Sequence, residues 1–371
     1  MHITIDRPAL LSTLAAAQGI VERRPSNPSL AQVLIETTPG GVRVTATDTT
    51  TTLISERPCA VTTPGAVAVD AANLLASLKA LSGPVVTLRT ISGNRLSVAA
   101  ASAVHNLLLG DANDYPPTPV VKDKATITLP GEVLARLITE IAPSISTDEN
   151  RYGLNGAHAE EVVGPDGANR LRFVSTDGSR LSYSEAPYQG RFAIGHKMLI
   201  PRKLLTEARK LLTGDAPWSL SFGERSAILS TQGTTLIGRL IEGEFPDYRN
   251  VLPASFKRRA AVEAKFFSEA LKNVRVMAND HYHLVRFSFE PDRVVLTAQN
   301  VEAGDARGEA AIDLSGSPLL TGFNLTFFQD LLAATKAEKI SLELGEALDP
   351  CIVRVVDRDD CLFVVMPMRL E

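Results

Sequence analysis

The chain lacks the features that mark several large classes of protein. Its three cysteines, Cys59, Cys351 and Cys361, are an odd and sparse set for a secreted disulfide framework. No run approaches the roughly 18 to 20 consecutive apolar residues of a membrane helix. The formal net charge of -4 excludes a uniformly basic nucleic-acid coat. We therefore expect a cytoplasmic protein without a membrane segment, in which any contact with nucleic acid depends on an uneven placement of charge.

The N-terminal residues do not have the pattern of a secretion signal. Residues 9–17 are largely apolar, but Asp6 cancels the charge of Arg7 in front of them, so there is no basic n-region. Residues 2–5 alternate between polar and apolar and predict a short strand. Asp6 is then a suitable cap for a helix that begins near Pro8.

The chain does contain a threefold internal repeat. Helix-like segments recur in two sets of three, at intervals close to one third of the 371 residues. Strand-like segments recur in phase with them and end at Asp48, Asp177 and Asn300. Segments rich in chain-breaking residues, 111–125 and 244–261, are typical of linkers. We therefore expect three equivalent domains. The expected helices are 8–21, 130–145 and 264–277 in one set and 69–81, 200–212 and 323–336 in the other, and the expected domains are 1–122, 123–254 and 255–371.

Each helix-like segment can bury one face. An apolar stripe with a period of 3.6 residues runs along the segment 200–212 and along 264–277. Strands that alternate, together with two one-sided helices per domain, predict an α+β fold in which helices pack on antiparallel sheets. The residues expected to face inward are Ile200, Leu204, Leu205, Ala208, Leu211 and Leu212 in the first segment and Phe266, Phe267, Ala270, Leu271 and Val274 in the second.

Charge is divided unevenly between the helices and the rest of the chain. The six helical segments, with the first extended to Arg24, contain twelve basic and seven acidic residues, so they carry +5 while the remainder carries -9. Such a surface attracts a phosphate backbone without reading bases. Ordinary solvent-exposed Lys and Arg side chains on helices account for the same count about equally well.

Five sequence strings, in order along the whole chain, resemble the bacterial DNA polymerase III β subunit, the replicative sliding clamp. Any one of them is too short to identify a family, but the five together with the threefold repeat are specific. They are Glu-Asn-Arg-Tyr-Gly-Leu-Asn-Gly at 149–156, Ser-Thr-Asp-Gly-Ser-Arg-Leu at 175–181, Ile-Pro-Arg-Lys-Leu-Leu at 200–205, Ile-Glu-Gly-Glu-Phe-Pro-Asp-Tyr-Arg-Asn-Val-Leu-Pro at 241–253 and Val-Val-Met-Pro-Met-Arg-Leu at 364–370.

The resemblance implies a head-to-tail homodimer in which three clamp domains per subunit form a six-domain ring around duplex DNA. Such a ring is a non-catalytic processivity factor that holds the replicative polymerase on DNA without sequence preference. The implied partners are double-stranded DNA, the α subunit of DNA polymerase III, the clamp loader, and other polymerases and repair proteins that bind through short peptide motifs. No cofactor and no metal are implied.

The resemblance also implies a groove that binds those peptide motifs. Met and Leu side chains suit such a groove because they adapt to different apolar anchors. A buried last strand accounts for the terminal Val-Val-Met-Pro-Met run as well, although Pro367 favours a sheet edge. The groove residues carried over are Leu154, Thr176, Gly178, Arg180, Leu181, Pro246, Val251, Val364, Met366, Pro367, Met368, Arg369 and Leu370.

Two further surfaces are expected. Arg24 corresponds to a DNA-contacting position of the family, and the other basic residues follow from helix charge: Arg202, Lys203, Arg209, Lys210, Lys272 and Arg275. The dimer interface is expected to join His105 and Leu107 of one subunit to Val276 and Met277 of the other, through strand pairing and apolar contact more than through charge.

The sequence departs from the family at several groove positions. Ser179, Gly153, Asn250 and Phe327 stand where His, an aromatic residue, a basic residue and Tyr are common, and Glu371 follows the usual terminal Leu. The preference for particular peptides is therefore left open.

Enzymatic alternatives have little support. The pair His281 and His283 has no third metal ligand nearby in sequence, and the acidic cluster 357–360 fits a hairpin turn between two strands. No Walker loop, zinc-protease or nucleophile-elbow motif occurs, and Ser179 has no identifiable base. The remaining alternative is a non-sliding nucleic-acid-binding or scaffold module with the clamp fold.

Overall fold

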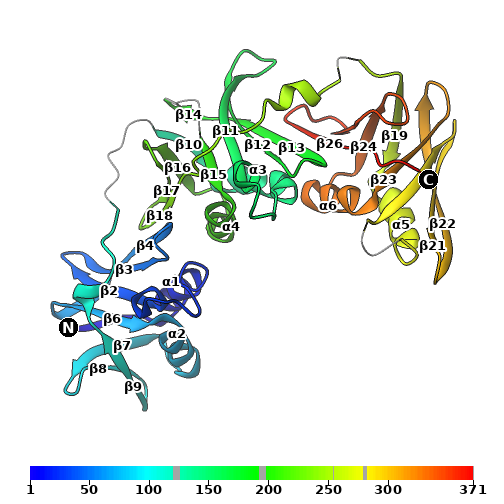
Figure 1. Cartoon of the computed structure of the whole chain (residues 1–371). Helices are drawn as coiled ribbons and strands as arrows, with labels where there is room; N and C mark the ends of the chain where they lie inside the picture. The colour runs from blue at the N-terminus through cyan, green and yellow to red at the C-terminus, as the bar shows by residue number, and fades with distance from the viewer. Residues whose placement is uncertain (120–125, 192–197, 254, 279–281, 371) are drawn as a thin grey trace. The chain divides into compact units, whose positions relative to one another are not determined.

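The computed structural model describes residues 1–119, 126–191, 198–253, 255–278 and 282–370 (Figure 1). In this part of the chain, a similar order of elements occurs three times, with five strands between the two α-helices of each of the first two repeats and four in the third. The carboxylate of Asp6 caps the first helix by accepting the N–H of Ala9 at 2.8 Å, as the sequence predicts. The helices are α1 (Arg7–Ala17), α2 (Ala71–Ala80), α3 (Gly131–Ile141), α4 (Arg202–Leu211), α5 (Ala264–Arg275) and α6 (Leu325–Thr335).

All strand pairs in the described residues are antiparallel, as the alternating patterns predict. The first repeat contains β1 (His2–Asp6), β2 (Gln32–Thr38), β3 (Gly41–Thr47), β4 (Thr51–Arg57), β5 (Ala60–Thr63), β6 (Ala66–Asp70), β7 (Val85–Ile91), β8 (Arg95–Ala100) and β9 (Ala103–Gly110). The second contains β10 (Thr126–Pro130), β11 (Gly156–Val163), β12 (Asn169–Thr176), β13 (Arg180–Pro187), β14 (Gln189–Gly190), β15 (Leu199–Pro201), β16 (Pro217–Phe222), β17 (Ser226–Thr231) and β18 (Thr234–Arg239). The third contains β19 (Arg258–Glu263), β20 (Leu284–Phe289), β21 (Arg293–Asn300), β22 (Gly304–Ser315), β23 (Leu319–Asn324), β24 (Lys339–Leu344), β25 (Cys351–Val355) and β26 (Cys361–Val365).

The chain forms two compact units, and each contains one large sheet. The first unit consists mainly of Met1–Leu134 and Lys203–Leu240, and the second mainly of Ala135–Tyr188 and Ile241–Glu371. In the first unit, the strand order is β14-β10-β16-β17-β18-β4-β3-β2-β6-β9-β8-β7-β1-β5. In the second unit, it is β15-β11-β12-β13-β26-β25-β24-β19-β22-β21-β20-β23.

Each sheet is continuous across a boundary between repeats. In the first unit, β18 of the second repeat pairs with β4 of the first repeat. In the second unit, β26 of the third repeat pairs with β13 of the second repeat. We call these pairings the first junction and the second junction. Because each junction joins parts of two repeats, the second repeat is divided between the two compact units.

The helices bury the apolar faces that their sequences predict, with one exception. In α4, Leu204, Leu205 and Ala208 are buried. In α5, Phe267 is fully buried and contacts Phe328 of α6 edge to face, with ring centroids 5.7 Å apart. The prediction for Phe266 is wrong, because this residue is 52% exposed and lies under the ammonium group of Lys265. The helix turns enough between adjacent residues to carry Phe266 off the buried stripe.

Two other expectations concern connections. The segment 244–261 is only partly a linker, because Arg258 to Ala261 belong to β19 and pair with both β22 and β24. The domain boundary at 122/123 falls outside the described residues, as does Ala254 at the other boundary, so both boundaries stay predictions. No helix among the described residues is long and apolar enough to cross a membrane.

Candidate functional site

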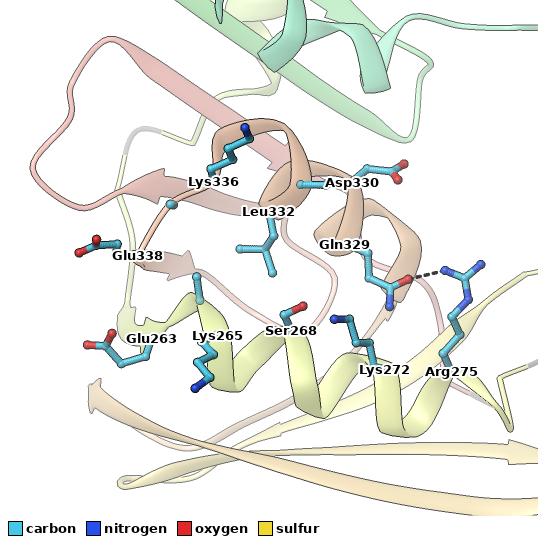
Figure 2. A pocket seen from close by; sticks show the side chains of 13 residues that line it. Glu263, Lys265, Ser268, Lys272, Arg275, Gln329, Asp330, Leu332, Lys336 and Glu338 are labelled. Atoms are coloured by element: carbon cyan, nitrogen blue, oxygen red, sulfur yellow. Dashed lines mark hydrogen bonds between the residues drawn. The ribbon is translucent and has the colours of Figure 1, made fainter.

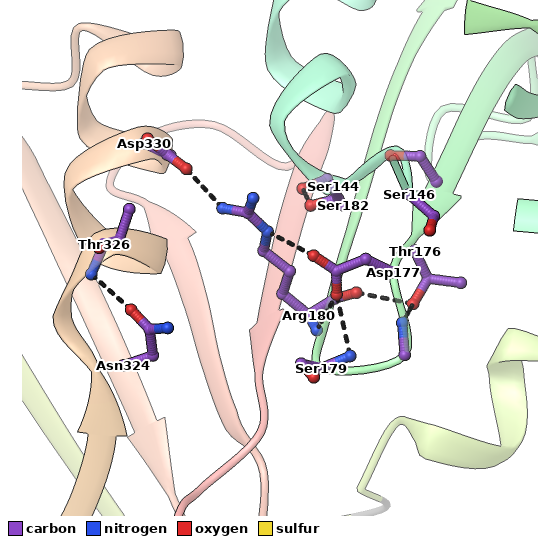
Figure 3. A network of polar contacts seen from close by, with 12 residues as sticks. Ser144, Ser146, Thr176, Asp177, Ser179, Arg180, Ser182, Asn324, Thr326 and Asp330 are labelled. Atoms are coloured by element: carbon purple, nitrogen blue, oxygen red, sulfur yellow. Dashed lines mark hydrogen bonds and ion pairs between the residues drawn. The ribbon is translucent and has the colours of Figure 1, made fainter. Parts of the chain in front are cut away.

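A tight turn between β12 and β13 organises one wall of the candidate site. The Asp177 carboxylate accepts the backbone N–H groups of Ser179 at 2.9 Å and Arg180 at 3.0 Å (Figure 3). The Thr176 hydroxyl donates to the Arg180 carbonyl at 2.6 Å and accepts the N–H of Gly178 at 3.1 Å. Gly178 has a φ of +90°, a conformation that favours glycine. The Thr-Asp-Gly string therefore encodes a fixed turn that leads directly into Arg180, the first residue of β13.

The floor of the site is apolar and lies at the second junction. Leu181 of β13 is opposite Val364 of β26, and both side chains are buried. They belong to a cluster that combines strands of two repeats with the segment after β18. This groove cluster consists of Val174, Leu181, Tyr183, Tyr248, Ile352, Leu362 and Val364, with Phe245, Leu252, Phe256 and Met366 packed against it.

The C-terminal residues lie across this floor. The strand β26 ends at Val365, and Pro367 follows it with no N–H to continue a ladder. The N–H of Met366 donates to the Ser179 carbonyl at 2.9 Å, and that of Met368 donates to the Gly322 carbonyl at 2.8 Å. The terminal segment thus connects β13 to β23. A buried last strand correctly describes Val364, whereas Met366, Pro367, Met368 and Leu370 are half-buried and Arg369 is exposed.

Two short helical turns contain or adjoin the remaining residues that the family resemblance implies for the groove. Leu154 ends the turn Tyr152–Leu154 and is half-buried. Val251 ends the turn Tyr248–Val251 and is 42% exposed, and the nearby Pro246 is also exposed.

Gly153 allows the two segments that carry these turns to approach closely. A Cβ atom at Gly153 would lie 2.9 Å from the Glu244 carbonyl oxygen, too close for any side chain at the present backbone positions. An aromatic residue here would therefore require the 243–244 backbone to move.

A polar network holds the hydroxyl group of Tyr248, which is a member of the groove cluster. Its hydroxyl donates to the Glu160 carboxylate and accepts from Arg172 at 3.0 Å. Burial raises the pKa of Tyr248 to about 12, and the hydrogen bond to Glu160 acts in the same direction. Arg172 also pairs with Glu185, which is buried. Because these polar groups satisfy one another, the ring of Tyr248 can face the apolar cluster.

Arg180, one of the predicted groove residues, forms ion pairs with two carboxylates. Its Nε donates to Asp177 at 2.9 Å, and its Nη1 donates to Asp330 of α6 at 2.6 Å (Figure 3). Its guanidinium carbon lies 4.5 Å from the centre of the Phe327 ring. Sequence reasoning did not place Asp330 at the site, although Phe327 and Asp330 are three residues apart and share a helix face.

The third repeat also presents a cleft of about 870 Å³ between α5 and α6, lined by four basic residues and by the carboxylates of Glu263, Asp330 and Glu338 (Figure 2). Lys265, Lys272 and Arg275 line it from α5, and Lys336 lines it from the end of α6. Arg275 donates to the Gln329 side chain at 2.6 Å. The cleft supplies several cations within one helix pair, as expected for a surface that contacts phosphates.

The other basic residues predicted to face DNA differ in their surroundings. Arg24 is exposed in the segment after α1, and Arg202 is exposed at the start of α4. Lys210 pairs with Glu207 at 2.7 Å, and Arg209 also has an interaction partner. Lys203 pairs with Asp48 and donates to the Ile20 carbonyl at 2.9 Å, so much of its charge is already compensated.

The residues expected at a dimer interface lie on the strand β9 and just after the helix α5. His105 and Leu107 are half-buried on β9, whose neighbours Val104 and Leu108 are 56% and 72% exposed. Val276 follows α5 and is 76% exposed, whereas Met277 packs partly against the core of the third repeat. The structure thus leaves apolar side chains exposed in both regions.

Features typical of a metalloenzyme are not found in the described residues. No group of three or more His, Cys, Asp or Glu side chains there could hold a metal ion. His281 lies outside the described residues, and His283 accepts the N–H of Leu325 through its carbonyl at 3.0 Å. The hairpin expected at 357–360 is confirmed, because this segment joins β25 to β26. Asp360 pairs with Arg136 and Arg358.

Comparisons with known proteins cover the whole chain. The models of the DNA polymerase III beta subunit match residues 1–119 with the N-terminal domain, 128–247 with the central domain and 249–369 with the C-terminal domain. The chain is 30% identical over 375 residues to the beta sliding clamp of Pseudomonas putida, with full coverage of both.

Two solved structures also share the fold. The DNA polymerase III subunit beta of Bartonella birtlesii, bound to griselimycin, has a TM-score of 0.93 and 28% identity, with full coverage of both chains. A Caulobacter crescentus beta sliding clamp, with polyethylene glycol in the region assigned to beta-motif tethering, has a TM-score of 0.92 and 29% identity, covering 100% of this chain and 99% of that one. The chain, with its three clamp domains, therefore belongs to the DNA polymerase III beta subunit family, the beta sliding clamps, which are non-catalytic processivity factors of DNA replication.

Proposed function

We propose that two copies of this chain close head to tail into a six-domain ring around duplex DNA. The observation that carries this proposal is the pattern of used and unused strand edges. In each junction, the last strand of one domain pairs with a strand of the preceding domain: β18 with β4, and β26 with β13. In both cases, the strand of the preceding domain follows a turn that an aspartate stabilises, Asp48 before β4 and Asp177 before β13. By the same rule, β9 is a last strand without a preceding domain in the chain, and β22 lacks a following one.

The edges of β9 and β22 support this assignment. Residues 103–108 of β9 pair with β8 on one side, and only its last two residues pair with β6 on the other. Residues 304–311 of β22 pair with β21, while β19 pairs only with the end of the strand. No other described strand covers these edges. Pairing β9 of one subunit with β22 of the next gives a heterologous contact, which forms a closed ring when the rotation matches.

The basic helices suit the inside of such a ring. Exposed Lys272 and the Arg275 side chain lie on the α5–α6 cleft, and Arg202 is exposed on α4. Contacts of this kind go to phosphates and are independent of base sequence. Because a closed ring remains on DNA by topology, a few weak contacts are sufficient, and tight ones would slow sliding.

We further propose that the groove cluster captures short peptide motifs of partner proteins. The expected partners are the α subunit of DNA polymerase III, the clamp loader, and other polymerases and repair proteins in the cytoplasm. Support comes from the exposed Val251 and Pro246 beside a buried apolar floor. The adaptable Met366 and Met368 lie along it. Griselimycin bound to the Bartonella clamp, and polyethylene glycol in the tethering region of the Caulobacter clamp, show that relatives accept ligands.

The decisive experiment separates topological retention from ordinary DNA binding. The chain is loaded onto a nicked circular plasmid with a bacterial clamp loader and ATP, and retention is measured by gel filtration before and after the plasmid is linearised. We expect retention on the circle and release from the linear DNA. Equal retention on both would favour a non-sliding binding module and overturn the proposal.

A surface variant tests ring closure directly. Val104→Lys places a charge on the free edge of β9, whereas Val85→Lys makes the same change at a 50% exposed position on β7. We expect the first variant alone to be monomeric by light scattering and to lose retention on the circle. A wild-type chain that is already monomeric at micromolar concentration would contradict the proposed dimer.

A further inference from the structure

We propose that Asp330 is a positioning residue that holds the Arg180 guanidinium against Phe327 and thereby sets the charge preference of the groove. This inference rests on the proposed peptide-binding function. Arg180 is one of the groove residues implied by the family, but Asp330 is on α6 of the following domain and reaches the groove only through Arg180 (Figure 3).

The guanidinium group of Arg180 already pairs with two carboxylates in the absence of a peptide. Asp177 accepts its Nε, Asp330 accepts its Nη1, and its side chain is only 16% exposed. Two carboxylates therefore face one guanidinium, so Asp177, Arg180 and Asp330 together carry a net charge of -1. An acidic peptide gains no unpaired cation from these three residues and is repelled by the extra carboxylate, whereas the exposed Arg369 is the other basic residue of the predicted groove.

The position of the guanidinium also closes the space behind the groove. Phe327, Leu331 and Phe363 line a small cavity with Arg180, and its volume of about 10 Å³ leaves room for about one water molecule at most. The guanidinium carbon lies over the Phe327 ring, 4.5 Å from its centre, within the range of a cation–π contact. When Asp330 no longer pairs with Arg180, the contact between Arg180 and Phe327 weakens, and the apolar floor of the groove is less well covered at this side.

The helix α6, which carries Asp330, is also held by a contact with α5. The adjacent residue, Gln329, accepts a hydrogen bond from Arg275 of α5 at 2.6 Å (Figure 2). Asp330 itself is 38% exposed in its side chain and lines the α5–α6 cleft. A carboxylate on a fixed helix can therefore orient Arg180 from outside the groove, and an isosteric amide at this position is compatible with folding.

The test uses Asp330→Asn and two fluorescein-labelled probe peptides with the same two leucines and one phenylalanine. One peptide carries three glutamates, and the other carries glutamines at the same places. We expect the variant to bind the glutamine peptide about threefold more weakly and the glutamate peptide about threefold more tightly, with the latter affinity falling as salt rises. Glu269→Gln, which removes an exposed carboxylate from α5, should change neither affinity.

Testing Asp330→Asn in the Arg180→Ala background separates the positioning of Arg180 from the simple removal of the Asp330 charge. Without Arg180, we expect Asp330→Asn to leave the affinity for the glutamine peptide unchanged. Equal shifts for both peptides, or the same loss in the Arg180→Ala background, would overturn the role of Asp330 while leaving peptide binding intact. A wild-type chain that binds neither peptide would instead overturn the proposed groove function and this inference with it.

Discussion

The two junctions between domains have the same backbone and different chemistry. In the first, Thr52 is opposite Ile237, and in the second, Leu181 is opposite Val364. Both junctions begin at an Asp turn in which one carboxylate oxygen accepts two backbone N–H groups. In both, the residue after the last one paired across the junction donates its N–H back to the turn: Arg239 to the Thr50 carbonyl, and Met366 to the Ser179 carbonyl.

The side chains then decide what each junction can do. At the first junction, the helix supplies a cation, because Lys203 of α4 pairs with Asp48 of the turn. At the second, the helix supplies an anion, because Asp330 of α6 pairs with Arg180. The hydroxyl of Thr52 is replaced there by the apolar side chain of Leu181, which joins the groove cluster. A repeated backbone thus provides the frame, and a few substitutions convert one copy into a candidate peptide site.

The largest expected difference between the junctions is in stability. Glu140 of α3 is 1% exposed, pairs with Arg358 at 2.8 Å and accepts from Ser184. Glu140→Gln removes one of the two carboxylates that pair with Arg358 and leaves Asp360, so we expect a loss of about 2 to 3 kcal/mol in the free energy of unfolding of the second unit. Urea unfolding followed by circular dichroism should show it. The single tryptophan, Trp218, lies in the first unit, so its fluorescence transition should stay in place.

The matched change at the first junction is Asp48→Asn. Lys203 keeps 38% of its side chain exposed, so solvent screening limits this pair to about 1 kcal/mol or less. Burial raises the pKa of Asp48, but hydrogen bonds from Lys203, Thr51 and Thr50 lower it more, so its folded pKa is below 3.8. The contribution is therefore complete above pH 3.8 and is lost as the pH falls through the folded pKa. An effect as large as that of Glu140→Gln would contradict this ranking.

The apolar difference between the junctions should control peptide affinity. Leu181→Thr gives the second junction the residue type of the first, and we expect about 2 kcal/mol of lost affinity, roughly thirtyfold in Kd, for the glutamine peptide. Fluorescence anisotropy measures it. Ile237→Thr removes a similar buried side chain at the first junction and should leave the Kd unchanged. Equal losses for both variants would place the peptide elsewhere.

The smallest expected effects concern DNA. Lys272 is exposed on the α5–α6 cleft, whereas Lys203 is committed to Asp48 at the first junction. Lys272→Ala should therefore lower the slope of log K against log salt by about one unit for DNA binding, and Lys203→Ala by less. A titration between low and moderate salt with a plasmid of arbitrary sequence is sufficient. The reverse order would indicate that Lys203 leaves its carboxylate when DNA is present.

Local pattern predicted the elements well, because helix and strand periodicity depends on residues that are close in sequence. The segment 323–336 contains α6, and Asp6 caps α1 as expected. Phe266 failed because its position at the margin of the α5 stripe is decided by neighbouring elements. The groove residues Leu181 and Val364 could be carried over from the family strings, but Asp330 could not. Its role depends on a contact with a residue 150 positions away.

The sequence by itself determined an acidic chain with a threefold repeat and a basic excess on its helices. It could not determine which of those basic side chains remain available. Lys203 and Lys210 count equally with Lys272 in composition, yet the first two are paired with Asp48 and Glu207. Only the tertiary structure decides this, because the charge that a side chain presents depends on partners that folding brings within a few ångströms. Contacts of this kind also distinguish the first junction, where Lys203 pairs with Asp48, from the second junction, which forms the floor of the groove.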